Sequence, residues 1–420
     1  MHKTTLKRVV VTGLGAITPI GNTIKEYWNG LVEGKSGAKP ITRFDTTHFK
    51  TKFACEVKNF DPLNYFDRKE ARKMDLFSQF AMAATQEAVE DAALPLDKIN
   101  LNKAGVIWAS GIGGLSTIQS ELLEFYENGR HPRFNPFFVT KMISNIPAGL
   151  ISIKYGFKGV NFSTVSACTS STHALIDAFN YIRLGKAYMI ITGGSEASIN
   201  ETGMGGFNAM KALSERNDSP ETASRPFDKD RDGFVLGEGA GTLILEELEH
   251  ALQRDAKIYA EVVGGGATAD AYHVTATHPE GEGARRAMQE ALEDAGLQAA
   301  DVDYVNVHAT STAVGDLSEA KAIEQLFGDH LSRLDISSTK SMTGHLLGAA
   351  GAIEAIASIL SMQYNLIPPT INHQETDENI SKNLHLTPNK AKEKTVHVAM
   401  SNTFGFGGHN AIAVFKKFDR

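Results

Sequence analysis

Cysteine is scarce in this chain of 420 residues, which contains only Cys55 and Cys168. Two cysteines cannot build the disulfide framework of a small secreted protein, so we expect a protein of the reducing cytoplasm. Long apolar runs are also missing, since no stretch approaches the roughly 20 uninterrupted apolar residues that span a bilayer. The apolar run at residues 9–17 is short, broken by glycine and without a clear cleavage site. It predicts a buried first strand and not a secretion signal.

An excess of positive charge is missing too, because 42 basic residues face 49 acidic ones and the formal net charge is −7. This balance argues against general binding to nucleic acid or to anionic membranes, and leaves room only for a local basic patch. The close histidine and cysteine spacings of zinc sites are missing as well, so we expect no metal. The length alone predicts two or three domains.

An internal repeat is present in the chain. A helical pattern at residues 85–94 (TQEAVEDAAL) precedes the apolar run 105–109 (GVIWA), and the same unit returns as 288–297 (MQEALEDAGL) before 304–308 (YVNVH). Apolar strands that alternate with amphipathic helices indicate an α/β fold with sheets covered by helices. We therefore predict two duplicated α/β halves, residues 1–255 and 256–420. The longer first half contains residues 115–159 and 193–239, where glycine and proline predict long ordered loops.

Cys168 lies where a β-branched run, residues 160–165, meets a helical pattern that begins near Ala174. The N-terminus of a helix stabilises a thiolate, and thiol pKa values fall from about 8.5 to roughly 3.5–7.5 in such places. This position predicts a reactive thiol with a lowered pKa. The alternative is a buried cysteine that only fills the core.

His308 and His345 lie in small, polar and glycine-containing stretches of the second half. Strand ends and helix starts of two α/β halves can meet at one crevice, so both histidines could share a site with Cys168. Two neutral imidazoles can donate N–H bonds to one thioester oxygen and stabilise an enolate. The alternatives are histidines on the surface or in the core. The glycine-rich loop 401–410 is either a plain hairpin or a source of N–H donors for an oxyanion.

Five motifs resemble the β-ketoacyl-acyl carrier protein synthases of type II, the condensing enzymes of fatty acid synthesis. They are VSACTS at 165–170, DKDRDGFV at 228–235, VHATST at 307–312, KSMTGH at 340–345 and NTFGFGG at 402–408. They follow the family's order over nearly the whole chain. The resemblance implies a thiolase-like fold in five layers, α-β-α-β-α, a homodimer and acyl carrier protein as partner. It implies no cofactor, because the substrates carry their own phosphopantetheine.

The resemblance also implies a role for each matching residue. Cys168 would carry the acyl chain as a thioester, and the amides of Cys168 and Phe404 would form the oxyanion hole. His308 and His345 would promote decarboxylation of malonyl carrier protein and stabilise the enolate that attacks the acyl group. The remaining positions are Lys340 and Glu354 for charge and geometry, Thr310 and Thr312 for the pantetheine arm, Ile112 and Phe207 for the acyl pocket, and Phe404 also as its gate.

Acyl carrier proteins are acidic, so a basic cluster is the predicted docking surface. Its residues are Arg68, Lys69, Arg72 and Lys73, with Arg130 and Arg133. The alternative is an ordinary solvated helix face. The sequence departs from the family at Ala309, where glycine is usual, and at His409, where threonine is usual. An extra methyl at Ala309 could tighten the pantetheine channel.

Three other functions compete with that of a condensing enzyme of fatty acid synthesis. A degradative thiolase needs a second cysteine in the C-terminal half, and no cysteine follows Cys168. A non-catalytic chain-length partner would lack the nucleophile. A ketosynthase of a polyketide or polyene pathway has the same motifs, so this alternative stays open.

Overall fold

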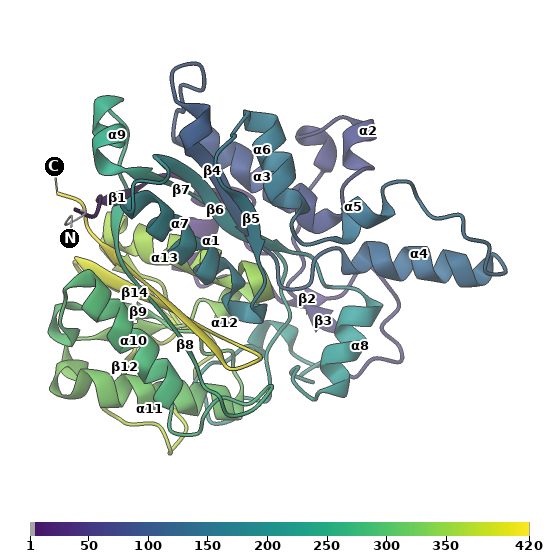
Figure 1. Ribbon diagram of the computed structural model, residues 1–420. Helices are drawn as coiled ribbons and strands as arrows, with labels where there is room; N and C mark the ends of the chain where they lie inside the picture. Colours follow the sequence, from purple (N-terminus) through teal and green to yellow (C-terminus); the bar gives the residue numbers. More distant parts are fainter. Residues whose placement is uncertain (1–4, 420) are drawn as a thin grey trace.

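The computed structural model describes residues 5–419 and is built around one large sheet (Figure 1). The strands are β1 Val9–Ile17, β2 Lys39–Pro40, β3 Phe53–Ala54, β4 Ala104–Ala109, β5 Asn161–Thr164, β6 Met189–Glu196, β7 Gly239–Glu247, β8 Ala260–Ala269, β9 Tyr304–Asn306, β10 Asp335–Ser337, β11 Leu366–Ile367, β12 His385–Leu386, β13 Lys392–Glu393, β14 Val398–Gly405 and β15 His409–Lys416. Eleven of them form the sheet β12-β10-β9-β14-β15-β8-β1-β7-β6-β4-β5.

The helices connect and cover these strands. They are α1 Ile24–Val32, α2 Arg68–Ala71, α3 Leu76–Asp91, α4 Leu115–Glu127, α5 Phe138–Met142, α6 Ile146–Tyr155, α7 Ser170–Arg183, α8 Glu201–Ala209, α9 Leu248–Gln253, α10 Glu282–Ala295, α11 Ala313–Phe327, α12 Lys340–Thr343 and α13 Ala350–Tyr364. The run at residues 9–17 is the fully buried strand β1, which confirms the prediction of a first strand.

Ten of the eleven strands form two similar parts, and β12 lies at the edge of the sheet beside β10. From its middle outward, one part runs β1-β7-β6-β4-β5 and the other β8-β15-β14-β9-β10. When the five strands of each part are numbered by their order along the chain, both parts have the same spatial order, 1-5-4-2-3. The inner pairs are antiparallel and the outer pairs parallel in both. β1 and β8 join the parts through residues 9–11 and 260–262.

Helices form three layers, which alternate with the two parts of the sheet. α7 and α13 lie in the middle, in one core cluster with residues of β1, β6, β14 and β15. α3 and α6 cover the outer face of the first part, while α10 and α11 cover that of the second. α13 is buried from Ala350 to Met362 because, apart from Glu354, its residues over this range are apolar or small on every side. The predicted α-β-α-β-α arrangement is confirmed.

The prediction of a long loop at residues 115–159 is wrong, because α4, α5 and α6 occupy most of it. Leu115, Ile118, Leu122 and Phe125 recur at helical spacing, and this periodicity outweighs the glycines. Residues 193–239 hold the end of β6 and the helix α8 in an otherwise mostly irregular segment. Among residues 5–419, every helix is too short or too polar to cross a bilayer.

Candidate active site

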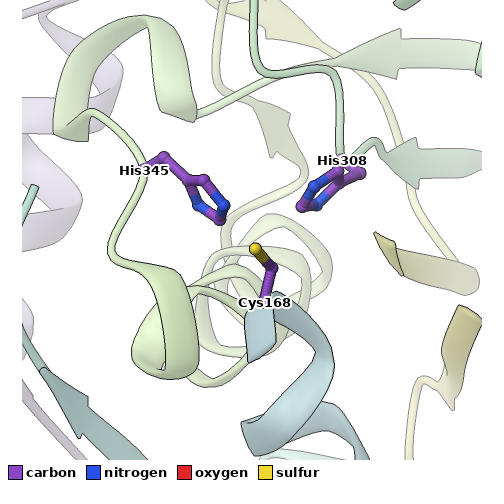
Figure 2. Close-up of side chains that lie close together, drawn as sticks. All are labelled: Cys168, His308 and His345. Atoms are coloured by element: carbon purple, nitrogen blue, oxygen red, sulfur yellow. The ribbon is translucent and has the colours of Figure 1, made fainter. Parts of the chain in front are cut away.

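A cavity of about 460 Å³ opens where strand ends from both halves meet. Cys168 precedes α7, His308 follows β9, and His345 lies between α12 and α13. Figure 2 shows the three side chains pointing toward one another from these separate elements. The Cys168 sulfur and one ring nitrogen of each histidine all lie within 4.8 Å of one another. The structure thus brings Cys168 together with two histidines that lie more than a hundred positions further along the chain.

A strained turn presents Cys168 to the cavity. The 3-10 turn Ala167–Thr169 begins with Ala167 at φ 51°, in the left-handed region that costs an alanine about 1–2 kcal/mol. Ser170 fixes the turn, since its hydroxyl donates to the Ala167 carbonyl at 2.6 Å and accepts from the Ser166 N–H at 2.9 Å. The helix α7 starts at once behind the sulfur, as predicted.

The pKa of Cys168 moves in the direction opposite to the sequence prediction. Burial raises it to about 12, although the Phe406 N–H and the charge of Lys340 act to lower it. The prediction of a lowered pKa is wrong because only 7% of Cys168 is exposed, and the loss of water outweighs the helix terminus. A thiol with a raised pKa needs a neighbouring base to take its proton before the sulfur can act as a nucleophile.

His308 and His345 are neutral near pH 7. Burial and the positive charge of Lys340 hold the pKa of both imidazoles well below the usual range. The rings meet edge to face with their centroids 5.2 Å apart. A neutral imidazole has one N–H donor and one nitrogen acceptor, so each ring can take a proton or donate a hydrogen bond.

Backbone contacts fix the two histidines in place. The N–H groups of His308 and Ala309 donate to the two carboxylate oxygens of Glu319 at 2.9 and 2.7 Å. The His345 N–H donates to the Val235 carbonyl at 2.8 Å, and the Phe234 ring lies edge-on to the His345 ring at 5.5 Å. Sequence reasoning missed Glu319, which looks like any other helix glutamate, and gave Phe234 no role within its motif.

Lys340 and Glu354 form a buried ion pair next to the histidines. Their Nζ and Oε1 atoms are 2.5 Å apart, and both side chains are at most 1% exposed. Burial raises the pKa of Glu354 to about 7, while Lys340 opposes this rise. The charge of Lys340 accounts for part of the low histidine pKa values.

The glycine-rich loop is the turn between β14 and β15, so it is both a hairpin and part of the site. Its N–H group at the Cys168 sulfur belongs to Phe406. Phe404, to which the prediction assigned that group, pairs with Asn410 in the strand ladder and sets its ring 5.7 Å from the His308 ring. A shift of two residues along the same motif explains the difference.

The cavity has an apolar part and a part with hydroxyl groups. Ile112 and Phe207 pack with Cys168 and Leu347 in one hydrophobic cluster. Thr310 and Thr312 line another part of the cavity, with their hydroxyl oxygens 3.1 Å apart.

Ala309 is not one of the described residues that line the cavity. It is 1% exposed and belongs to the hydrophobic cluster that contains Val307 and Ile323. The expectation that its methyl tightens the pantetheine channel is therefore wrong, because the segment after β9 turns this side chain into the core. His409 stands beside the glycine turn, with its ring edge-on to that of His173 at 6.4 Å.

The predicted basic cluster lies on the surface. All six residues are exposed, namely Arg68, Lys69, Arg72, Lys73, Arg130 and Arg133. The Lys73 ammonium lies 5.6 Å from the centre of the Phe137 ring, next to the start of α5. Arg130 packs over Tyr126 of α4 at 5.5 Å.

Cysteine and histidine are also common zinc ligands, so the cluster of Cys168, His308 and His345 has the donor types of a metal site. The buried ammonium of Lys340 opposes the binding of a cation there.

Known proteins resemble this chain over nearly its whole length. The model of the β-ketoacyl synthase N-terminal domain matches residues 6–251, and that of the C-terminal domain matches residues 259–374. The 3-oxoacyl-[acyl-carrier-protein] synthase 2 of Synechocystis sp. is 50% identical, with 98% of each chain covered. The protein of the same description from Coxiella burnetii is 48% identical and covers 98% of this chain and 99% of its own.

A solved structure has the same architecture. It is a type II polyketide synthase acyl-carrier protein in complex with its ketosynthase bound to the hexaketide. The TM-score is 0.91 at 33% identity, and 99% of this chain and 100% of that chain are covered. The fold, the shared site and these matches lead to one assignment: the chain belongs to the β-ketoacyl synthase family.

Proposed function

We propose that this protein is a 3-oxoacyl-[acyl-carrier-protein] synthase, an acyltransferase that elongates fatty acids by two carbons. It condenses malonyl carrier protein with an acyl chain held on Cys168. The observation that carries the proposal is the meeting of one buried thiol and two neutral imidazoles in a cavity with an apolar part. The relatives named 3-oxoacyl-[acyl-carrier-protein] synthase 2 support it.

The first step loads the acyl chain. The Cys168 sulfur attacks the thioester carbonyl of acyl carrier protein while its proton passes to a neutral imidazole. The N–H groups of Cys168 and Phe406 stabilise the oxyanion, as the place of Phe406 beside the sulfur supports. The intermediate then collapses, the pantetheine thiol leaves with a proton, and the chain stays on Cys168.

The second step forms the new carbon–carbon bond. The malonyl thioester oxygen accepts N–H bonds from His308 and His345, and carbon dioxide leaves as the enolate forms. The enolate carbon attacks the carbonyl of the acyl-Cys168 thioester. The Cys168 thiolate departs, takes up a proton, and a β-ketoacyl carrier protein is released.

Other residues support these steps in our proposal. Lys340, balanced by Glu354, keeps both imidazoles neutral through its charge. Thr310 and Thr312 bind the pantetheine arm, and Ile112 and Phe207 contact the acyl chain. Phe406 is better placed than Phe404 to gate the cavity, because Phe406 lies half-buried in the turn and Phe404 is 5% exposed in a strand.

The protein works with acyl carrier protein and with a second copy of itself in this proposal. The exposed basic residues of α2 and its end, with Arg130 and Arg133, form the carrier surface. The edge strand β5 and the exposed apolar residues Leu123 and Tyr126 of α4 support a homodimer. α4 projects from the body of the molecule, where a partner can cover it (Figure 1).

We further propose a division of the chain at residue 255, a cytoplasmic location and a reaction without cofactor. The division is supported by the strand order that occurs in both parts of the sheet. The location is supported by the two free, buried cysteines. The chemistry needs no group beyond the thiol, the imidazoles and the phosphopantetheine of the substrates.

A ketosynthase of a polyketide or polyene pathway is the alternative. The similarity to a polyketide ketosynthase favours it, at 33% identity. The identity of 50% to a protein named for fatty acid synthesis favours elongation of fatty acids.

Intact mass after incubation with medium-chain acyl carrier protein tests the proposal. We expect the wild type to gain one acyl mass and the Cys168→Ala variant to gain none. Malonyl carrier protein should then discharge the acyl group as a β-ketoacyl product. A wild type that gains no acyl mass with any chain length contradicts the proposal.

A further inference from the structure

Glu196 is a buried carboxylate that the reaction described above does not use. It ends β6, is fully buried and lies behind the cavity wall, outside the residues that line the cavity. Within residues 5–419, its recorded partners are five neutral donors and no ion pair includes it. A buried carboxylate without a cation is expensive to desolvate, so its donors must hold it firmly.

Four of the five donors come from two loops that belong to different halves of the chain, and the fifth is the hydroxyl of Ser198, which reaches Oε1 at 3.4 Å. After β4, the N–H of Gly111 reaches Oε2 at 2.8 Å and the N–H of Ile112 reaches Oε1 at 3.3 Å. The Ser110 hydroxyl adds a bond to Oε1 at 3.3 Å. From the second half, the N–H of Gly348 donates to Oε2 at 3.1 Å. One carboxylate therefore ties the two loops together.

The two loops touch so closely that no side chain fits between them. A Cβ on Gly348 would lie 2.1 Å from the Gly111 nitrogen and 2.9 Å from Oε2 of Glu196. A Cβ on Gly111 would lie 2.8 Å from the same oxygen. The backbone-to-backbone contact and the carboxylate thus fix the distance between the loops jointly.

Each loop carries a residue of the acyl cavity next to its glycine. Ile112 follows Gly111, Leu347 precedes Gly348, and both pack with Cys168 in one cluster. We propose that Glu196 is a positioning residue that sets the spacing of Ile112 and Leu347 and thereby the length of acyl chain that reaches Cys168. The link to acyl chains rests on the proposed function.

The ionised carboxylate suits this place because every recorded partner can donate, and it prevails above about pH 7 because burial raises the pKa of Glu196 to about 7. A glutamine has the same shape but offers one oxygen and one NH₂ group. Its NH₂ must face an N–H or hydroxyl donor, which leaves groups unpaired and pushes the loops apart.

The test compares long and short chains in the Glu196→Gln variant. With hexanoyl and palmitoyl carrier protein as substrates, we expect kcat/KM for palmitoyl to fall about tenfold more than kcat/KM for hexanoyl. The rate at which N-ethylmaleimide and N-dodecylmaleimide label Cys168 tests the width of the acyl cavity without carrier protein. In Glu196→Gln, labelling by the long reagent should be slowed more than labelling by the short one. A loss of stability alone would slow both chain lengths alike.

Glu246→Gln is the matched control. Glu246 is also fully buried, lies on the neighbouring strand β7 and is held by Thr12, His250 and Arg254, away from the cavity. We expect this variant to lose stability and keep the wild-type ratio of long to short chains. If Glu196→Gln does not fold, Ser110→Ala removes one donor and should shift the ratio in the same direction by less.

Unchanged ratios in Glu196→Gln, for both the substrates and the maleimides, overturn the inference and leave the proposed function intact. The opposite outcome can be told apart from this one. If carrier-bound chains never acylate the wild type, but Glu196→Gln changes the ratio of the two maleimide rates, the proposed function is rejected and the positioning role is supported.

Discussion

The turn that holds Cys168 and the turn that holds Gly348 have the same backbone and different chemistry. Each is a 3-10 turn that runs directly into a central helix, Ala167–Thr169 into α7 and Leu347–Ala349 into α13. Each begins with a left-handed residue, Ala167 at φ 51° and Leu347 at φ 47°. The second position is the thiol in one turn and glycine in the other. The duplicated unit therefore offers two equivalent places, of which only one carries a thiol.

The surroundings of the two turns explain this difference. The end of β14, from the second half, leads to the Phe406 N–H at the Cys168 sulfur, and the cavity leaves room for the side chain. The end of β6, from the first half, brings Glu196 to the Gly348 N–H, and the Gly111 backbone fills the space. Each half holds the turn of the other, but only at Cys168 does the second position of the turn open to the cavity.

The largest expected effect comes from giving the second turn a side chain. In Gly348→Ala the new methyl meets the Gly111 nitrogen, which is backbone and cannot move aside. We expect the free energy of unfolding to fall by about 3 kcal/mol or more. Urea denaturation measures it, with Gly206→Ala as control because a Cβ there has nothing within 4 Å. Equal stability of the two variants would break the comparison of the turns.

Buried carboxyl groups in both halves predict a pH dependence of stability. Burial raises the pKa of Glu87 and Glu196 in the first half, and of Glu319 and Glu354 in the second, to about 7 in each case. The folded protein then keeps protons that the unfolded chain releases above its ordinary pKa of about 4.3. The free energy of unfolding should fall as pH rises from about 5 to 8, by on the order of 1–3 kcal/mol per group.

Glu87→Gln checks this dependence far from the catalytic cluster. Glu87 accepts from the N–H groups of Ala16 and Ile24, so its loss should flatten the slope of stability against pH between about 5 and 8. Glu246 serves as control, since His250 and Arg254 hold its pKa below the usual range. Its replacement by glutamine should leave the slope in that window unchanged.

A smaller effect is expected when the charge behind the histidines is removed. In the double variant Lys340→Met, Glu354→Gln, the pKa values of His308 and His345 should rise toward the usual range. The acid limb of the pH–rate profile of malonyl decarboxylation should then move to higher pH by about one unit. The single Glu354→Gln variant retains the ammonium and should keep the wild-type limb, so a limb that does not differ between the two variants contradicts the role of Lys340.

The smallest effect is expected at Ala309. Its methyl packs in the core of the second half, so Ala309→Gly should lower the free energy of unfolding by about 1 kcal/mol and leave KM for carrier-bound substrate unchanged. Thermal unfolding and steady-state kinetics of the same preparation measure both quantities. A fall in KM would show that the methyl reaches the pantetheine channel after all.

Much of the fold could be predicted because helical and strand periodicity were clear and because the unit occurs twice. The motifs also indicated Cys168, His308 and His345 as one site. The pKa of Cys168 could not be predicted, since it depends on burial by segments far along the chain. The same holds for Glu196 and Glu319, whose carboxylates look like surface residues until long-range folding surrounds them with N–H groups.

The shared middle layer has a consequence for how the protein is made. α7 and α13 belong to different halves and bury their apolar sides in one common core. While the ribosome is still adding the second half, α7 can pack on β4 and β6 of its own half, but the side that α13 covers in the folded protein faces water. The nascent chain should therefore bind chaperones until α13 has emerged, and a chain stopped at residue 255 should aggregate and not fold.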